Sequence, residues 1–277
     1  MEIWYKDWQN TQHARIFDGR AGFDARNLVR DFQAHNDVRL LSERLDPQRE
    51  ATLLEVGCAT GEFYRYLRVA HPRIGYWGVD ISEPALARAR NKYPEGRFMR
   101  VMPGQSLKDV MPASGLPSAP HIIFSKDVIQ HQTHPFEFLS DLIQTAAELV
   151  VFRGRTRDRG KTELNPDVSC QYHYGGWMPY IILNLDELLE HIRGMVPKSE
   201  VVVYRHHMVL GGQHGRYLPK DCYLKETGTA ETAVGVILNS DRPGRVAVED
   251  RVDQNPRYTI DYLVRRGLQR AVGRLRR

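Results

Sequence analysis

The sequence predicts an α/β fold with a doubly wound, mostly parallel sheet of seven strands. Short apolar runs alternate with helical patterns from residue 51 onward, which is typical of βαβ units with helices on both faces of the sheet. The chain has 277 residues, 42% of them hydrophobic and 26% charged. This is enough material for one sizeable core and too little for two.

The first 50 residues have a helical pattern. Apolar residues recur close to helix spacing among charged ones, and Asp46-Pro47 ends the run. These apolar positions are Leu28, Phe32, Val38, Leu41 and Leu45. An earlier polar arm contains Trp4, Tyr5, Trp8 and Phe17, so we expect an N-terminal helical arm over residues 1–48.

Five apolar runs predict the parallel strands of the sheet. They are Ala51–Val56, Tyr76–Ile81, Phe98–Met102, His121–Phe124 and Leu149–Phe152. The segments Glu62–Val69, Pro84–Lys92 and Phe136–Ala147 have helical character and lie between them. Alternation at this spacing favours strands that run parallel, because each helix returns the chain to the starting edge of the sheet.

Two later runs complete the predicted sheet. Glu200–Tyr204 and Ala233–Leu238 have no clear helix between them, so we expect an antiparallel pair at one edge. Residues 154–180 interrupt the rhythm as an irregular insertion, and long irregular segments in compact domains are usually functional or disordered. We expect a cofactor-binding domain over 49–240 that contains this insertion, and a C-terminal extension over 241–277.

Charge and cysteine content exclude several classes of protein. Net charge is +5, but six arginines lie in 265–277 without an acid, and the rest of the chain carries −1. A near-neutral body argues against a surface built mainly as a nucleic-acid groove. Cys58, Cys170 and Cys222 are too widely spaced for a disulfide framework or a zinc site. No segment has the length and apolarity of a signal peptide or a membrane span, so we expect a cytoplasmic protein.

The strongest local motif is Leu53–Phe63, LLEVGCATGEF, in which a strand, a glycine turn and a helix follow one another. Gly57 permits a tight turn and Gly61 lets a ligand approach the helix start. A dinucleotide fingerprint would need glycines where Ala59 and Glu62 stand, and a phosphate-binding loop would need Lys and Ser or Thr after Gly61. Both alternatives fail.

The acids around this turn favour a cationic nucleoside over a polyphosphate. Glu55 and Glu62 bracket the turn and would repel a pyrophosphate. Asp80 closes the second strand, where a carboxylate can accept hydrogen bonds from two ribose hydroxyls. S-adenosylmethionine meets both requirements, because its sulfonium and ammonium groups outweigh its single carboxylate.

On these motifs the chain resembles the class I S-adenosylmethionine-dependent methyltransferases, with a Rossmann-like fold, over about Leu53 to Phe152. The family's acidic-Gly-x-Gly-x-Gly turn is matched except at Ala59. The resemblance implies cofactor contacts, and the expected residues are Glu55, Gly57, Cys58, Ala59, Gly61, Asp80, Ile81, Gln105, Ser106 and Ser125. Gln105 or Ser106 stands where the family commonly has an acid beside the adenine. Phe124–His131, FSKDVIQH, resembles the segment that lines the methyl-transfer pocket of the small-molecule branch.

His131 and Asp127 are the candidate catalytic residues. A neutral imidazole can remove the proton of an acceptor hydroxyl or amine, and Asp127 is placed to orient that imidazole or the substrate. A structural His131 and a helix-capping Asp127 are the alternatives. The aromatic stretch Tyr172, His173, Tyr174 and Trp177 is a candidate lid over a sugar or ring, or simple loop packing. His206, His207 and His214 lack a recognisable metal-ligand spacing.

The predicted function is methyl transfer to a hydroxyl or amine of a small molecule or saccharide, such as a cell-surface glycan or its precursor. The run from Tyr258 to Arg277 predicts a basic amphipathic helix that could hold the enzyme at the inner face of an anionic membrane, or dock on its own domain. Two alternatives stay open. One is an RNA or protein methyltransferase anchored by this tail, and the other is a non-catalytic subunit that binds S-adenosylmethionine.

Overall fold

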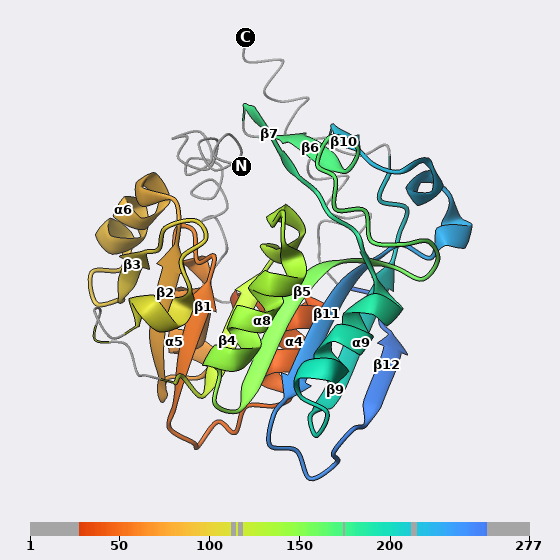
Figure 1. The fold of residues 1–277 in the computed structure, drawn as a ribbon. Helices are drawn as coiled ribbons and strands as arrows, with labels where there is room; N and C mark the ends of the chain where they lie inside the picture. The colour runs from red at the N-terminus through yellow and green to blue at the C-terminus, as the bar shows by residue number, and fades with distance from the viewer. Residues whose placement is uncertain (1–27, 112–114, 116–118, 174, 212–214, 254–277) are drawn as a thin grey trace, which may run out of the picture.

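The main sheet has the strand order β12-β9-β11-β5-β4-β1-β2-β3, and a short strand β8 pairs beside β5. The computed structural model describes residues 28–253 except 112–114, 116–118, 174 and 212–214. The chain runs through β1, β2 and β3 to one edge and then returns to β4 beside β1 (Figure 1). This reversal between β1 and β4 creates a switch point, where α/β sheets bind ligands at the carboxyl ends of their strands.

The strands of the main sheet are β1 Ala51–Val56, β2 Ile74–Asp80, β3 Phe98–Arg100, β4 Ile122–Lys126, β5 Leu149–Arg157, β8 Leu183–Asn184, β9 Glu200–His207, β11 Ala230–Ile237 and β12 Val246–Asp250. The helices are α3 Leu28–Gln33, α4 Asn36–Ser42, α5 Glu62–Ala70, α6 Glu83–Lys92, α7 Leu107–Val110, α8 Pro135–Thr145 and α9 Leu185–Met195. Short 3₁₀ turns are η2 Ile129–His131, η3 Lys220–Tyr223 and η4 Lys225–Thr227.

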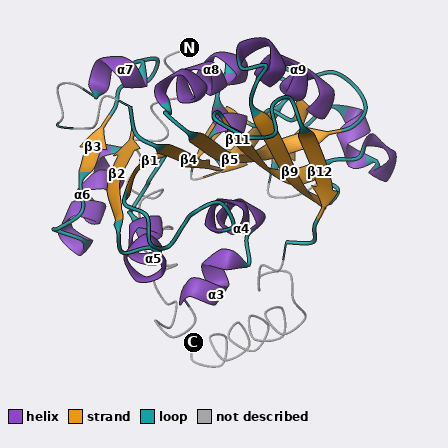
Figure 2. Ribbon diagram, turned by 90° about the horizontal axis from the view of Figure 1, so that it is seen from below, coloured by secondary structure: helices purple, strands orange, loops and turns teal. Residues whose placement is uncertain are grey.

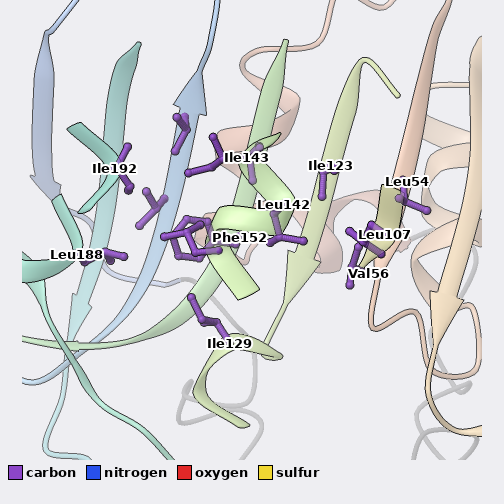
Figure 3. Packing of buried hydrophobic residues seen from close by; sticks show 14 of the residues in the cluster. Leu54, Val56, Leu107, Ile123, Ile129, Leu142, Ile143, Phe152, Leu188 and Ile192 are labelled. Atoms are coloured by element: carbon purple, nitrogen blue, oxygen red, sulfur yellow. The ribbon is translucent and has the colours of Figure 1, made fainter. Parts of the chain in front are cut away.

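Helices cover both faces of the sheet (Figure 2). Alternate residues of each strand point to opposite faces, so Leu54, Ile123 and Phe152 pack under α8 and α9 (Figure 3). On the other face Leu53 and Val151 pack with the residues of α4, α5 and α6. Two separate cores therefore hold the strands, which fixes their carboxyl ends as a rigid edge.

The five predicted parallel strands are confirmed, as are the helices that connect them. β9 and β11 are antiparallel to each other as expected, and β11 is also antiparallel to β5. Their expected position at the edge is wrong, because β12 pairs parallel to β9 and forms the edge itself. The expected N-terminal helix is two short helices, α3 and α4.

Residues 154–180 are more regular than the sequence predicts. β5 continues through Gly154 to Arg157, and a second sheet forms from β6 Cys170–His173, β7 Gly176–Pro179 and β10 Arg216–Tyr217. This small sheet lies beyond the carboxyl ends of the main strands (Figure 1). The charged residues that suggested a loop are instead accommodated by opposite charges on the neighbouring elements.

Some predictions fall on residues outside the described ranges. These are the aromatic residues of the arm before residue 28, the basic helix over 258–277, Tyr174 and His214. Within the described ranges, none of the helices has the length and apolar character needed to cross a membrane.

Candidate active site

The glycine turn after β1 is held by backbone hydrogen bonds to the end of β2. The amides of Gly57 and Cys58 both donate to the Val79 carbonyl, at 2.8 and 3.1 Å. Gly57 and Gly61 have φ of +85° and +79°, a conformation that disfavours any side chain. The turn at both glycines therefore requires the residue type that the sequence supplies.

The two glycines are also packed tightly against protein atoms. A Cβ on Gly57 would lie 2.2 Å from Val128 Cγ2, and one on Gly61 would lie 2.8 Å from Phe98 Cζ. Phe98 fills the Cβ position of Gly61, and the approach of a ligand to the backbone there stays a prediction. The contact with Val128 brings the turn after β1 against the segment after β4.

Asp80 ties the two cofactor loops together. Its Oδ2 accepts from the amide of Ala59 and its Oδ1 from the amide of Ser82, both at 2.8 Å. Ala59 has φ +46°, unfavourable for an L-residue, and this hydrogen bond stabilises it there. The carboxylate thus sits between the β1–α5 loop and the start of α6.

Burial dominates the electrostatics of this half of the site. The pKa of Glu55 is raised to about 8, mainly by desolvation and further by the negative charge of Asp80, although the Tyr76 hydroxyl donates to it at 2.5 Å. The pKa of Asp80 is also raised by burial, against the effect of its backbone donors. A ligand with positive charge would offset both penalties, whereas a pyrophosphate would increase them.

The residues here fit the nucleoside sulfonium that the sequence suggested. Beside the two buried acids, the hydroxyls of Thr60 and Ser82 are buried and have no hydrogen-bond partner within the described part of the chain. Both stand on the loops that follow β1 and β2. Unsatisfied buried hydroxyls are costly, and a bound molecule with polar edges would remove that cost.

Other predicted cofactor residues have structural partners. Ser106 caps α7 and donates to Asp141 Oδ1 at 2.6 Å, and Ser125 donates to the Val56 carbonyl at 3.0 Å. Gln105 accepts from its own loop at Met102 N, 3.2 Å away. Cys58 is buried, and burial raises the pKa of its thiol. Ile81 follows β2 at the carboxyl edge and packs against the larger core.

The segment after β4 carries Asp127, Val128 and His131, and Val128 packs against the glycine turn. Asp127 has φ +58°, and its Oδ1 accepts from Arg155 Nη1 at 2.8 Å and lies 3.3 Å from Arg153 Nε. These arginines hold the pKa of its carboxyl well below the ordinary range. Asp127 is therefore ionised at all physiological pH values, and its side chain is 36% exposed.

His131 is oriented by a backbone carbonyl. Its Nδ1 lies 2.8 Å from the carbonyl oxygen of Pro179, so the protonated nitrogen is Nδ1 and Nε2 carries the lone pair. Burial lowers the pKa of His131 to about 4, so the ring is neutral near pH 7. Pro179 holds the ring at Nδ1, Asp127 Oδ1 binds the two arginines, and a role of Asp127 toward the imidazole or the substrate stays a prediction.

A network of buried charges lies under this segment. Arg153 and Arg155 on β5 both pair with Glu231 on β11, and Arg153 also pairs with Asp37 of α4. Asp253 lies 3.6 Å from the same arginine. Glu231, Asp37 and Asp253 are at most 5% exposed. Each of these carboxylates therefore depends on its ion-pair partners for compensation of its charge.

The sequence analysis missed this network, and one signal could have found it. Arg153, Arg155 and Arg157 alternate along β5, and their side chains point to one face of the sheet. Alternating arginines that follow a buried strand indicate a continued strand with acids opposite. Tyr180 was also missed: its hydroxyl accepts from Arg155 Nε at 2.9 Å, and its ring lies edge-on to His131.

The aromatic stretch lies on the small sheet. Tyr172 and Trp177 are register partners on β6 and β7 with ring centroids 5.3 Å apart, and His173 stands beside Tyr172. His206 and His207 lie on β9, away from this stretch, and His207 pairs with Asp250. Among the described residues, no group of three or more His, Cys, Asp or Glu side chains is arranged to hold a metal ion.

Comparison with known proteins agrees with this geometry. A family model described as a methyltransferase domain matches residues 54–148. No curated protein sequence matches the chain. The N-terminal domain of EvdMO1, crystallised in the presence of SAH and D-fucose, has 14% identity, covers 79% of this chain and 85% of its own, and has a TM-score of 0.51.

Two further solved structures are similar at lower scores. CurJ carbon methyltransferase has 17% identity and a TM-score of 0.45, and the match covers 73% of this chain but 52% of CurJ. The O-methyltransferase of a trans-AT PKS multienzyme from Brevibacillus brevis, in complex with S-adenosyl-L-homocysteine, has 14% identity, coverage of 73% and 71%, and a TM-score of 0.48. The chain thus spans about half the length of CurJ.

The fold and the site define an α/β protein whose switch point accepts a cationic nucleoside. The family match adds that residues 54–148 are similar to a methyltransferase domain, which agrees with the resemblance to the class I S-adenosylmethionine-dependent methyltransferases.

Proposed function

We propose that the chain transfers a methyl group from S-adenosylmethionine to a hydroxyl or amine of a small molecule, and that this acceptor is a saccharide. One observation carries the proposal. Val128 packs on Gly57, so the cofactor turn after β1 adjoins the segment that carries Asp127 and His131. A methyl donor on that turn and an acceptor beside His131 would therefore be neighbours, as direct transfer requires.

We assign the cofactor contacts to the two loops at the switch point. Asp80 would accept hydrogen bonds from the ribose hydroxyls through its remaining lone pairs, and Glu55 would face the ammonium group. Gly57, Cys58, Ala59 and Gly61 would supply backbone to the methionine portion, Ile81 would pack on the adenine, and Gln105 would face its amino group. Ser106 and Ser125 support these loops through the bonds described above.

When bound, the sulfonium supplies a methyl carbon with a neutral thioether as leaving group. The residues of the chain hold the acceptor and take its proton. Nε2 of His131 would take the proton that the acceptor hydroxyl or amine gives up when it is methylated. Because its Nδ1 proton is held by Pro179, His131 would then carry a positive charge, which the ionised Asp127 nearby would stabilise.

Asp127 and the small sheet favour a hydroxylated acceptor. Arg153, Arg155 and Glu231 compensate the charge of Asp127, so the site offers a carboxylate that accepts hydrogen bonds without strongly attracting cations. Tyr172, His173 and Trp177 of the small sheet would cover the acceptor, and the fourth predicted residue, Tyr174, lies outside the described residues. A sugar presents both hydroxyl groups and a C–H face.

The test is calorimetric titration of S-adenosylmethionine and S-adenosylhomocysteine into the purified chain, with NAD as a decoy. We expect micromolar binding of the first two, and a loss of at least tenfold, about 1.4 kcal/mol, in Asp80→Asn. Asp109→Asn changes an exposed acid on α7 and serves as the matched control. A folded sample that binds neither ligand would overturn the proposal. A chain that binds S-adenosylmethionine but transfers no methyl group to any saccharide tested would favour the non-catalytic subunit.

From the sequence alone, we also propose that Arg265–Arg277 holds the enzyme at an anionic membrane surface of the cytoplasm, near a lipid-linked acceptor. Sedimentation with vesicles of anionic or neutral lipid would test this. We expect binding to anionic vesicles only, abolished by deletion of 265–277. Salt-sensitive RNA binding lost with the same deletion would instead favour the nucleic-acid alternative.

A further inference from the structure

The small sheet carries a group of exposed aromatic side chains from three strands. Tyr172 of β6, Trp177 of β7 and Tyr217 of β10 are 49%, 41% and 64% exposed. The Trp177 centroid lies 5.3 Å from Tyr172 and 5.8 Å from Tyr217, both edge-on. We call these three residues the aromatic triad. Large exposed aromatic side chains that gather in one place usually mark a binding surface.

The triad is an uncharged surface. Of the residues in β6, β7 and β10, Arg216 is the one with a full charge at neutral pH. Its guanidinium lies 4.4 Å from the centroid of the buried Tyr180 ring and donates to the Leu210 carbonyl at 3.3 Å. Stacking platforms for single-stranded nucleic acid combine aromatic rings with a positively charged groove. The triad has rings without such a groove in its strands, which favours a neutral ligand.

The exposed area of the triad is too small for a protein partner. An aromatic side chain buries about 150–250 Å² when fully covered. At the exposures above, the triad offers roughly 230–390 Å², against about 800 Å² per partner in a stable protein interface. A ligand about the size of one ring matches this area.

The triad is continuous with the proposed acceptor site through β7. Trp177 precedes Pro179 by two residues, or roughly 7 Å of extended strand. The Pro179 carbonyl is the group that holds His131. Trp177 and the group that holds His131 therefore lie on the same short strand.

We propose that the aromatic triad is a second sugar subsite, and that the acceptor is a saccharide of at least two pyranose rings. The methylated ring lies beside His131 and Asp127, and its neighbour stacks its C–H face on Trp177 and Tyr217. The two ends of the site require different properties of one molecule. The exposed part of the Asp127 carboxylate can accept hydrogen bonds from hydroxyl groups, the triad offers rings to a flat apolar face, and each pyranose ring has both properties. An acyl chain would contact the triad but would offer Asp127 no further donor.

The inference depends on the proposed function, so the experiment measures both. The full chain is first titrated with S-adenosylhomocysteine, and the resulting complex is titrated with methyl glycosides of single sugars and of their β-linked disaccharides. We expect disaccharides to bind at least tenfold more tightly than the single sugars. Tyr217→Ala, at a residue outside the proposed acceptor cover, should remove most of that gain and leave the weak single-sugar binding unchanged. Trp177→Ala should also remove most of the gain.

Two further variants make the result decisive. Trp177→Phe keeps a ring and should retain most of the gain, and Leu224→Ala removes an exposed apolar side chain outside the triad and should have no effect. A folded chain that binds S-adenosylhomocysteine but shows no preference for disaccharides overturns the subsite alone. The same holds if the triad variants instead weaken binding of an oligouridylate or an acyl thioester. Failure to bind S-adenosylhomocysteine overturns the proposed function itself.

Discussion

The pKa values of carboxyl groups are shifted in opposite directions in the two halves of the candidate site. In the cofactor half, Glu55 and Asp80 are buried beside each other and burial raises the pKa of both. In the acceptor half, Asp127 and Glu231 are also largely desolvated, but Arg153 and Arg155 lower the pKa of both. The same residue type is thus left under-compensated in one half and fully paired in the other.

This difference indicates what each half is built to receive. A cationic cofactor would supply the positive charge that the first half lacks. The second half already contains its compensating charges, so a neutral acceptor can enter without disturbing the balance. The halves also differ in how they are assembled: the first comes from one strand–helix–strand unit, and the second joins residues from position 35 to position 253.

The largest expected effect is on the stability of the acceptor half. Arg153→Met would leave Glu231, Asp37 and Asp253 without their shared partner, and breaking a buried ion pair from one side costs about 3–5 kcal/mol. Urea unfolding measures the loss. Arg49→Met, which breaks an exposed pair with Glu148, is the control and should change stability little.

Two readouts make this prediction sharper. If the halves are independent, the affinity for S-adenosylmethionine should survive in Arg153→Met at temperatures where the variant is folded. An unfolding midpoint equal to that of Arg49→Met would show that the network contributes no net stability, and the contrast between the halves would lose its energetic basis.

The next effect concerns His131. His131→Gln can still donate to the Pro179 carbonyl but cannot take a proton, so kcat should fall about 100-fold while the cofactor Kd stays unchanged. Because burial lowers the pKa of His131 to about 4, wild-type kcat should stay flat as pH falls through 6.5. A kcat that halves near pH 6.5, or a variant that loses affinity instead of rate, would contradict the role of base.

The last effect concerns Glu55, whose pKa of about 8 lies above its ordinary value of 4.5. The folded state therefore holds this proton more tightly than the unfolded state, and that stabilisation is complete below pH 4.5 and lost as pH rises to 8. Glu55→Gln removes this dependence, so the stability of the variant relative to wild type should increase between pH 5 and 8.

Urea unfolding of wild type and Glu55→Gln at pH 5 and at pH 8 measures this change in relative stability. Glu148→Gln is a control of opposite sign, since Arg49 lowers the pKa of Glu148, and its stabilisation is lost as pH falls. Parallel stability curves for wild type and Glu55→Gln would mean that Glu55 is ionised in the folded chain.

Much of the cofactor half could be predicted because its contacts are local. Positive φ at Gly57 and Gly61, and a carboxylate at the end of the second strand, follow from residues within 25 positions of one another. The acceptor half could not be predicted this way. Arg153 lies next to the segment that the sequence predicts as an irregular insertion. The acids that compensate its charge come from α4, β11 and the segment after β12, so no local pattern indicates them.

The sequence by itself determined the parallel strands, the glycine turn and the position of Asp80, because periodicity and turn geometry are properties of short segments. Only the tertiary structure decided that β12 covers β9, that Pro179 holds His131, and that Tyr217 joins Tyr172 and Trp177. Each of these depends on which distant segments meet, and pairing between distant segments is fixed by packing and charge compensation across the whole chain.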